Sequence, residues 1–503
     1  MECAPSADGI GIVNPHSLIL ITVDCLRADH VGFLGYQRPT TPFLDCLAEE
    51  SVVFENAIAA GAPTYYAMPP MLASRYPLAL GRDVLGIAPE ESTLASVLQE
   101  SGFATAAFSA ANPYISPRFG YDRGFEVFAD FLHGSEPTGA SGTRSGNFRN
   151  RANRLLANAC HSVGLGGAYD EIYFQYCQRL AARRDVSLDA VRRFPSAEIL
   201  IDNAMRWLKE HCHQRFFLWL HFMDAHGPYF PKTEALKIMG RGDLDAARAV
   251  YLNSYWNRGD VSVERLRTKR EDVVALYDAG IRWVDEQVRR LAENLVELNV
   301  WDRCALAVTA DHGEEFLEHG GRAHLPKKLT EELLHVPLML RVPASPKHRV
   351  QSPSSLLDLA PTLLDVAGIP APAEFRGRSL WGQLRKGKFM ERPVVSECVY
   401  DCTNPFFPKD RMGPRLLAIR LNQYKLVLDF AGGSGQLYDL SRDPGEKAPL
   451  AMSEAAEVRQ KLLTATKRHL VESCQSRDFD RRMASQVREY RLELARSATH
   501  ARN

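Results

Sequence analysis

Four short apolar runs constrain the fold of this chain more than any other feature of its sequence. They are SLILITVD at 17–24, FATAAFSA at 103–110, FFLWLHFMD at 216–224 and CALAVTAD at 304–311. Each run is apolar almost throughout instead of alternating with polar residues, which is typical of a strand covered on both faces. We therefore expect four buried β-strands that belong to a largely parallel sheet.

Segments with helical periodicity lie between these runs, with apolar residues spaced three and four positions apart. They are TTPFLDCLAEES at 40–51, STLASVLQESG at 92–102, AEILIDNAMRWLKEH at 197–211 and VVALYDAGIRWVDEQVRRLAENLVEL at 273–298. The alternation of strands and helices predicts an α/β fold, a doubly wound and mostly parallel sheet with helices on both faces.

Changes in composition and in hydrophobic pattern divide the chain into parts of unequal length. We expect a catalytic α/β domain over 14–388, interrupted by a helical insertion at 132–195 that begins with the low-complexity stretch GSEPTGASGTRSG. The later segments LLAIRLNQYKLVLDF and AGGSGQLYDLSRDPGE indicate a hairpin with Gly-rich turns, and so a small antiparallel subdomain over 389–450. A charged helical tail over 451–503 completes this prediction.

Charge and apolar length exclude several classes of partner. Lys plus Arg and Asp plus Glu number 61 each, so no overall field directs the chain to nucleic acid or to an anionic membrane. No run reaches the roughly 18 apolar residues of a membrane span, and the start lacks the pattern of an export signal. Ten cysteines are scattered without metal-finger spacing, and only Cys398 and Cys402 are close enough in sequence to suggest a disulfide or a metal pair. We expect a soluble cytoplasmic protein with no membrane segment and no nucleic-acid partner.

The residues that end three of the four runs have metal or proton chemistry. The first run ends at Asp24, the third leads into His226, and the fourth ends at Asp311 with His312 after it. Ligands of open α/β sheets bind at the carboxyl ends of the strands, where these side chains would meet. Two carboxylates and an imidazole there suit one divalent cation, although a lone Asp at a strand end is more often a turn or cap residue.

The stretch GAPTYYAMPPMLASRYP at 61–77 places a hydroxyl, that of Thr64, at the start of a helical run. Threonine there can cap the helix by accepting an orphan backbone N–H. It can also serve as a nucleophile, because a metal ion favours the ionised hydroxyl and a helix N-terminus favours an anion such as sulfate or phosphate.

Longer segments show that the chain resembles the sulfatase family of the alkaline phosphatase superfamily. In family order they are LILITVDCLRADHVGFLGYQRPTTPFLDCLAEESVVFENAIA, ASRYP, SPRFGYDRGFEVF, FFLWLHFMDAHGPYFP, LAVTADHGEEFLEHGGRAHLPKKLTEELLHVPLML, DLAPTLLDVAGIP, RGRSL, YKLVLDF and LYDLSRDPGE. The segments span roughly residues 14–450, and together they are far more specific than any one motif.

The resemblance implies roles for individual residues. Asp24, Asp311 and His312 would bind one divalent metal ion, which could be calcium, manganese, magnesium or zinc. Thr64 falls in the nucleophile position, which in this family lies thirteen residues before the proline of the closing Arg-Tyr-Pro, here Pro77. The resemblance also implies further catalytic residues that contact the ester: His226, which would meet the ester or its leaving group, and His324 and Lys327, which would hold the anion's oxygens, with Lys328 as a register alternative for Lys327.

Four departures from the family pattern bear on the reaction. Sulfatases proper carry Cys or Ser in a Cys-x-Pro-x-Arg pattern that is oxidised to formylglycine, whereas here Thr64, Tyr66 and Met68 occupy those positions. Threonine cannot become formylglycine. Cys25 stands where many members have a second metal-binding Asp.

A phospho-threonine can be hydrolysed by water, but a sulfo-threonine would lack the gem-diol route of release. The sequence therefore favours a hydrolase of a phosphodiester or phosphonate ester on a small-molecule, glycan or lipid-linked substrate. The alternatives are a sulfuric ester hydrolase without formylglycine, a transferase of phosphoglycerol or phosphoethanolamine groups, and a catalytically silent scaffold in which Thr64 only caps its helix. Tyr65, Tyr66 and Tyr229 would either line a pocket or pack in the core, and we expect His319 and His335 to be structural.

Overall fold

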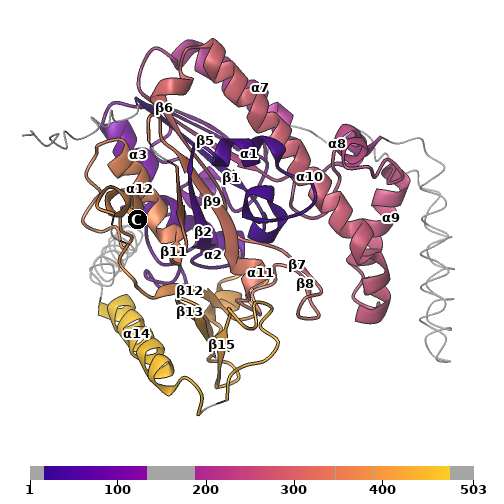
Figure 1. Ribbon diagram of the computed structural model, residues 1–503, viewed down its shortest axis with the longest axis vertical. Helices are drawn as coiled ribbons and strands as arrows, with labels where there is room; N and C mark the ends of the chain where they lie inside the picture. The colour runs from indigo at the N-terminus through magenta and orange to yellow at the C-terminus, as the bar shows by residue number, and fades with distance from the viewer. Residues whose placement is uncertain (1–15, 133–186, 346, 388, 452, 476–503) are drawn as a thin grey trace, which may run out of the picture.

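The four expected strands lie side by side in the middle of one sheet, in the order β6-β1-β5-β3 (Figure 1). Their bounds are Ser17–Val23 for β1, Ala104–Ser109 for β3, Phe216–Phe222 for β5 and Cys304–Ala310 for β6. The structure is a computed structural model that describes residues 16–132 and 187–475, apart from 346, 388 and 452. Most of the expected insertion at 132–195, and the end of the expected tail, lie outside the described residues.

Within the described residues the sheet has nine strands, in the order β10-β2-β9-β6-β1-β5-β3-β4 with β11 beside β2. The added strands are β2 (Val52–Ile58), β4 (Val127–Ala129), β9 (His335–Arg341), β10 (His348–Val350) and β11 (Ser354–Ser355). Only β9 runs against its neighbours, β6 and β2, and every other pair is parallel. The prediction of a mostly parallel sheet is confirmed.

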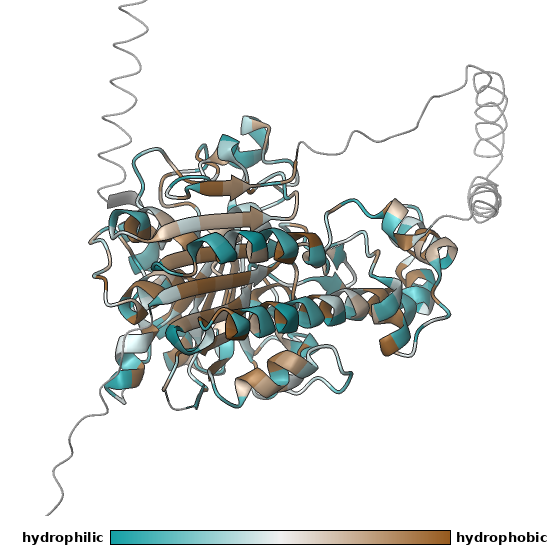
Figure 2. Cartoon of the chain, turned by 90° about the horizontal axis from the view of Figure 1, so that it is seen from above, coloured by the Kyte–Doolittle hydropathy of each residue, from teal (hydrophilic) through white to brown (hydrophobic). Residues whose placement is uncertain are grey.

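Two groups of helices cover the sheet (Figure 1). One group packs around α1 (Pro42–Ala48), α7 (Ala197–His211) and α10 (Val263–Glu297), and the other around α2 (Thr64–Ala73), α3 (Leu94–Glu100) and α12 (Leu359–Val366). The shorter helices are α6 (Leu188–Val191), α8 (Thr233–Ile238), α9 (Ala246–Trp256), α11 (Glu331–Leu334) and α13 (Leu380–Arg385). Figure 2 shows hydrophilic residues on the outer faces of helices and hydrophobic strands behind them. Among the described helices, none combines the length and the apolar character needed to cross a membrane.

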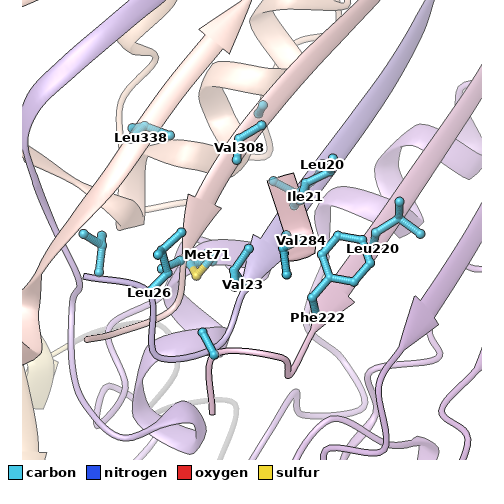
Figure 3. Close-up of a cluster of buried hydrophobic side chains, with 14 of the residues drawn as sticks. Leu20, Ile21, Val23, Leu26, Met71, Leu220, Phe222, Val284, Val308 and Leu338 are labelled. Atoms are coloured by element: carbon cyan, nitrogen blue, oxygen red, sulfur yellow. The ribbon is translucent and has the colours of Figure 1, made fainter. Parts of the chain in front are cut away.

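The core fills both faces of the central strands (Figure 3). Leu20 and Ile21 follow one another in β1 and are both completely buried. Successive side chains of a strand point to opposite faces, so each face of β1 must be covered. Met71 of α2 and Val284 of α10, one from each helix group, lie in the same cluster. Burial on both sides explains why these strands read as continuous apolar runs.

A smaller antiparallel sheet follows, in the order β12-β13-β14-β15. Its strands are β12 (Val394–Val399), β13 (Arg415–Leu421), β14 (Tyr424–Asp429) and β15 (Ser434–Asp439). Helix α14 (Ala456–Gln475) packs on it through Leu462, which joins a separate small core with Leu417 and Leu437. The small antiparallel sheet expected near the C-terminus is present, and the limits of the domains stay a prediction.

Candidate active site

The order of the strands places the two predicted carboxylates beside each other. Asp24 follows β1 and Asp311 follows β6, and these neighbouring parallel strands end in register, with Val23 opposite Ala310. Both carboxylates are completely buried. The carboxyl edge of the sheet therefore holds a cluster of polar side chains with little access to water.

Asp24 lies at the centre of this cluster. Its Oδ2 accepts a hydrogen bond from Asn112 Nδ2 at 2.8 Å and lies 3.3 Å from His221 Nε2. The Thr64 hydroxyl points at the same oxygen from 3.4 Å, and the Cys25 thiol lies 3.2 Å from Oδ1. Asn112 follows β3 and His221 lies in β5, so four neighbouring strands contribute to the cluster.

Asp311 and His312 each place one atom with a lone pair in the cluster, Oδ2 of Asp311 and Nε2 of His312. Asp311 Oδ1 accepts the backbone N–H groups of His312, at 2.9 Å, and Cys25, at 3.3 Å, but Oδ2 is buried without a hydrogen-bond partner in the described chain. His312 donates Nδ1–H to Gly313 O at 2.8 Å, which leaves Nε2 as an acceptor 3.5 Å from Asp311 Oδ2 and 3.6 Å from Asp24 Oδ1. An imidazole fixed by its second nitrogen in this way is typical of a metal ligand.

The surroundings of the two carboxylates shift their pKa values in opposite directions. Burial opposes the ionisation of Asp24, but the nearby imidazoles of His226, His221 and His312 outweigh it and hold its pKa well below the ordinary value. Burial, and then the charge of Asp24, raise the pKa of Asp311. Two neighbouring buried carboxylates repel each other when both are ionised, and a bound cation would offset this repulsion.

Thr64 is the first residue of α2, and Pro63 occupies the N-cap position. The reading of Thr64 as a helix cap is therefore wrong: its hydroxyl makes no capping hydrogen bond. It lies 3.2 Å from His312 Nε2 and 3.4 Å from Asp24 Oδ2 instead. The structure brings Thr64 to Asp24 and His312, two of the three residues predicted to bind metal, and Asp311 Oδ2 lies 3.5 Å from the same His312 nitrogen.

His226 and His324 lie next to this group. The ring of His324 is centred 4.6 Å from that of His312 and 5.0 Å from that of His226. His324 Nδ1 lies 3.3 Å from Cys25 Sγ and 3.4 Å from Glu314 Oε2. Both predicted histidines are only partly buried, so they border the open side of the cluster.

The two lysines differ in their contacts. Lys328 Nζ donates to both oxygens of Glu315, at 2.8 and 2.9 Å, and to His319 O, so it is occupied in holding its own loop. Lys327 Nζ is about half exposed and lies 3.2 Å from the equally exposed Asp401. Of the two lysines, Lys327 is therefore the less constrained by its contacts in the described structure.

Three residues of the cluster were not identified from the sequence. Asn112 reads as a loop residue before Pro113, His221 reads as part of a buried strand, and Glu314 stands inside the quoted TADHGEE without an assigned role. The sequence signal that could have identified these three residues is a polar residue inside or just after an otherwise apolar run. The tyrosines, in contrast, pack: Tyr65 lies against Tyr66 and Tyr114, and Tyr229 against Tyr277 and Phe316.

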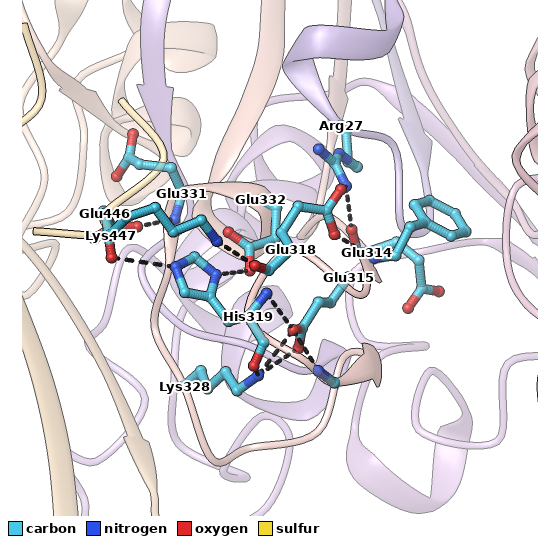
Figure 4. Close-up of polar contacts among 12 residues, drawn as sticks. Arg27, Glu314, Glu315, Glu318, His319, Lys328, Glu331, Glu332, Glu446 and Lys447 are labelled. Atoms are coloured by element: carbon cyan, nitrogen blue, oxygen red, sulfur yellow. Dashed lines mark hydrogen bonds and ion pairs between the residues drawn. The ribbon is translucent and has the colours of Figure 1, made fainter. Parts of the chain in front are cut away.

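A network of charged side chains holds the loop that carries His324 (Figure 4). The loop contains the small hairpin of β7 (Glu315–Phe316) and β8 (Arg322–Ala323). Glu315 accepts the N–H groups of His319 and Gly321 at 2.9 and 2.8 Å, and His319 Nδ1 lies 2.7 Å from Glu332 Oε1. His335 Nε2 donates to Glu55 O, so the structure places His319 and His335 in structural hydrogen bonds.

The His319–Glu332 pair predicts a pH dependence of stability. The hydrogen bond to Glu332 raises the pKa of His319, although partial burial opposes it. A raised pKa contributes stability that is complete below about pH 6.5 and is lost as the pH rises through the folded-state value. We expect the melting temperature of the wild type to fall by about 1–2 °C more than that of Glu332→Gln between pH 6 and 8.5. The exposed substitution Glu457→Gln is the control, and parallel curves for wild type and Glu332→Gln would refute the assignment.

Comparison with known proteins agrees with this geometry. The profile of the family described as Sulfatase matches residues 16–369, which include every residue of the cluster. The chain belongs to the sulfatase family. The profile of the C-terminal region of N-sulphoglucosamine sulphohydrolase matches residues 321–473, which take in the small sheet and α14. Membership of the sulfatase family makes this chain a hydrolase of sulfate or phosphate esters.

Its relatives within this sulfatase family are distant. The multifunctional alkaline phosphatase superfamily protein PehA of Trinickia caryophylli is 25% identical over 86% of this chain and 91% of its own length. Choline-sulfatase of Rhizobium meliloti is 31% identical over 44% of this chain and 40% of its own length. Arylsulfatase K of Bos taurus is 29% identical, and the match covers about a third of each protein, 36% of this chain and 34% of the relative.

Solved structures show the same fold. The phosphonate monoester hydrolase of Agrobacterium radiobacter superimposes with a TM-score of 0.62 at 18% identity, covering 92% of this chain and 96% of that one. BT4656 in complex with its substrate D-glucosamine-2-N,6-O-disulfate gives a TM-score of 0.65 at 17% identity, covering 93% and 99%. At these identities the likeness supports the fold and leaves the substrate of this chain open.

Proposed function

We propose that this chain is a metal-dependent hydrolase of a phosphodiester or phosphonate ester and that Thr64 is its nucleophile. The observation that carries the proposal is the position of the Thr64 hydroxyl, which is buried between Asp24 and His312 at the first turn of α2. The secondary hydroxyl of threonine cannot be oxidised to the aldehyde that sulfate-ester cleavage by formylglycine requires. It can form a phosphate ester that water later hydrolyses.

The residues around Thr64 fit a divalent cation. Asp24, Thr64, Asp311 and His312 would hold it, because Asp311 Oδ2, which has no hydrogen-bond partner in the described residues, lies 3.5 Å from His312 Nε2, and the Thr64 hydroxyl lies 3.2 Å from the same nitrogen. Calcium, manganese, magnesium and zinc all accept carboxylate oxygens, and the imidazole suits zinc best among these four ions. When bound, such an ion would favour the ionised hydroxyl and neutralise charge on the ester.

The chain's own residues have the following roles in this proposal. The Thr64 oxygen bonds to phosphorus while the bond to the leaving oxygen breaks, and the proton of the hydroxyl ends on that leaving oxygen. Asp24, whose pKa is held well below the ordinary value, stays an anion beside it. His226 and His324 border the open side of the cluster, where they meet the ester and its leaving group, and the partly exposed Lys327 attracts the negative charge of the ester. Water then attacks the phosphorus of the phospho-threonine, which releases the product and restores Thr64.

The alternatives differ in the central atom or in the acceptor. The names of the relatives include both sulfatases and a multifunctional alkaline phosphatase superfamily protein, which keeps a sulfuric ester hydrolase as the second candidate. A phosphoglycerol or phosphoethanolamine transferase would use the same phospho-threonine with another acceptor than water. A silent scaffold would neither bind metal nor turn over any ester. The substrate would be a small-molecule, glycan or lipid-linked ester.

The ratio of two turnover rates and a trapped intermediate test the proposal. We expect bis-nitrophenyl phosphate to be cleaved at least about tenfold faster than nitrophenyl sulfate, because only the phosphorus ester has an escape route from threonine. Acid quenching during turnover of bis-nitrophenyl phosphate should leave a nitrophenyl phosphate group on Thr64, because only one nitrophenolate has left, and mass spectrometry detects this adduct. Faster cleavage of the sulfate, with no phosphorylated Thr64, would favour the sulfuric ester hydrolase.

A further inference from the structure

A second group of metal-binding atoms adjoins the first. Cys25, His226 and His324 each offer one ligand atom within 4.8 Å of the others, and Cys25 Sγ lies 3.3 Å from His324 Nδ1. Zinc binds thiolate at about 2.3 Å and imidazole at about 2.0–2.1 Å, so sulfur and nitrogen ligands of one tetrahedral zinc lie about 3.5 Å apart. The observed separation of the thiol and the imidazole nitrogen matches that value closely.

The backbone holds Cys25 in a strained conformation that directs its thiol into the site. Its φ of 62° lies in the left-handed region, which residues other than glycine rarely adopt. The Cys25 N–H donates to Asp311 at 3.3 Å, and Tyr277 donates its hydroxyl to the Cys25 carbonyl at 2.7 Å. Hydrogen bonds at both the N–H and the carbonyl of Cys25 hold this strained backbone in place, which is characteristic of functional positions.

Two residues near the Cys25 thiol, His226 and Glu314, also carry atoms suited to bind a cation. His226 Nδ1 donates to Gly227 O at 2.5 Å, which leaves Nε2 free to bind a cation. Glu314 is 1% exposed, and its Oε2 lies 3.4 Å from His324 Nδ1, while Oε1 has no hydrogen-bond partner in the described part of the chain. A buried carboxylate oxygen without a partner requires an explanation.

We propose that Cys25, His226 and His324 hold a second cation, zinc, with Glu314 supporting it, beside the cation assigned to Asp24, Asp311 and His312. Thiolate and imidazole ligands select zinc over calcium or magnesium. The inference deepens the proposed function, because the two imidazoles then act on the ester through the cation they bind.

Metal content and cobalt spectroscopy test the second site without relying on turnover. The full-length protein is stripped with a chelator and reloaded with Zn²⁺ or Co²⁺. We expect two zinc equivalents in the wild type and one in Cys25→Ser, and a thiolate-to-Co²⁺ charge-transfer absorption that disappears in Cys25→Ser. His324→Gln, in a loop, should also bind one equivalent and provides a second variant if Cys25→Ser folds poorly. Cys304→Ser, a buried cysteine at the other end of β6, should behave as wild type.

Two results would overturn the inference: a wild-type Co²⁺ protein without thiolate absorption, or Cys25→Ser and His324→Gln variants that bind as much zinc as the wild type. These results are independent of the nucleophile. Loss of two-site binding leaves a Thr64-dependent hydrolase with one cation, and a Thr64 variant with full activity leaves the zinc count unaffected.

Discussion

Replacing Thr64 with alanine should lower the turnover of phosphodiesters by about 10⁴-fold or more, since removal of a catalytic nucleophile has effects of this size or larger. The expectation rests on the position of the hydroxyl, 3.2 Å from His312 Nε2 and 3.4 Å from Asp24 Oδ2 at the start of α2. Steady-state rates with bis-nitrophenyl phosphate at saturating metal measure the effect. The fall should appear in kcat, because the substrate still binds.

Thr64→Ser is the matched control for this substitution. Serine keeps the hydroxyl and should retain a substantial part of the activity, whereas both variants should fold as the wild type because Pro63, not Thr64, occupies the N-cap. Full activity in Thr64→Ala would show that another group or a free water attacks the ester. An equal loss in both variants would point to packing around the methyl group of Thr64 instead of chemistry.

The fold could be predicted where local pattern and burial agree. The four central strands were identified because both of their faces are covered, and α7 was identified with its observed bounds because its apolar stripe is regular. Strands β2 and β9 were missed. Helix α10 begins at Val263, ten residues before the periodic run, because its first turns are largely polar and show no apolar stripe. The direction of β9 depends on the order of strands in the sheet, which no local pattern contains.

The site could be predicted only in part, for a related reason. Asp24, Asp311 and His312 stand at strand ends, where chemistry is expected, and the resemblance to sulfatases added Thr64, His226, His324 and Lys327. The structure brings Thr64 and both histidines to the carboxylates, whereas Lys327 pairs with Asp401 at a partly exposed position, and the roles of these residues stay predictions. Asn112 and His221 reach Asp24 because β5 and β3 follow β1 in the sheet. That neighbourhood joins residues about 90 and 200 positions apart, so composition and spacing could not reveal it.

Asp311→Asn should lower activity by about 10³-fold and remove the cation held by Asp24 and His312, because a metal ion supplies several kcal/mol of transition-state stabilisation. Asparagine has the same shape, and its Oδ1 can still accept the N–H groups of His312 and Cys25. The change replaces only Oδ2, the oxygen that has no hydrogen-bond partner in the described residues. Metal content and turnover measure these two effects.

The same substitution should have opposite effects on stability with and without metal. Burial and the charge of Asp24 raise the pKa of Asp311, so the metal-free wild type loses stability as the pH rises from about 4 through that folded-state value. The amide cannot ionise, so metal-free Asp311→Asn should melt at or above the wild-type temperature at pH 7. With metal at 100 times its dissociation constant, the wild type gains about 2.7 kcal/mol that the variant lacks, and the order of melting temperatures should reverse. A variant that is less stable in both conditions would mean that Asp311 serves the fold and not a cation.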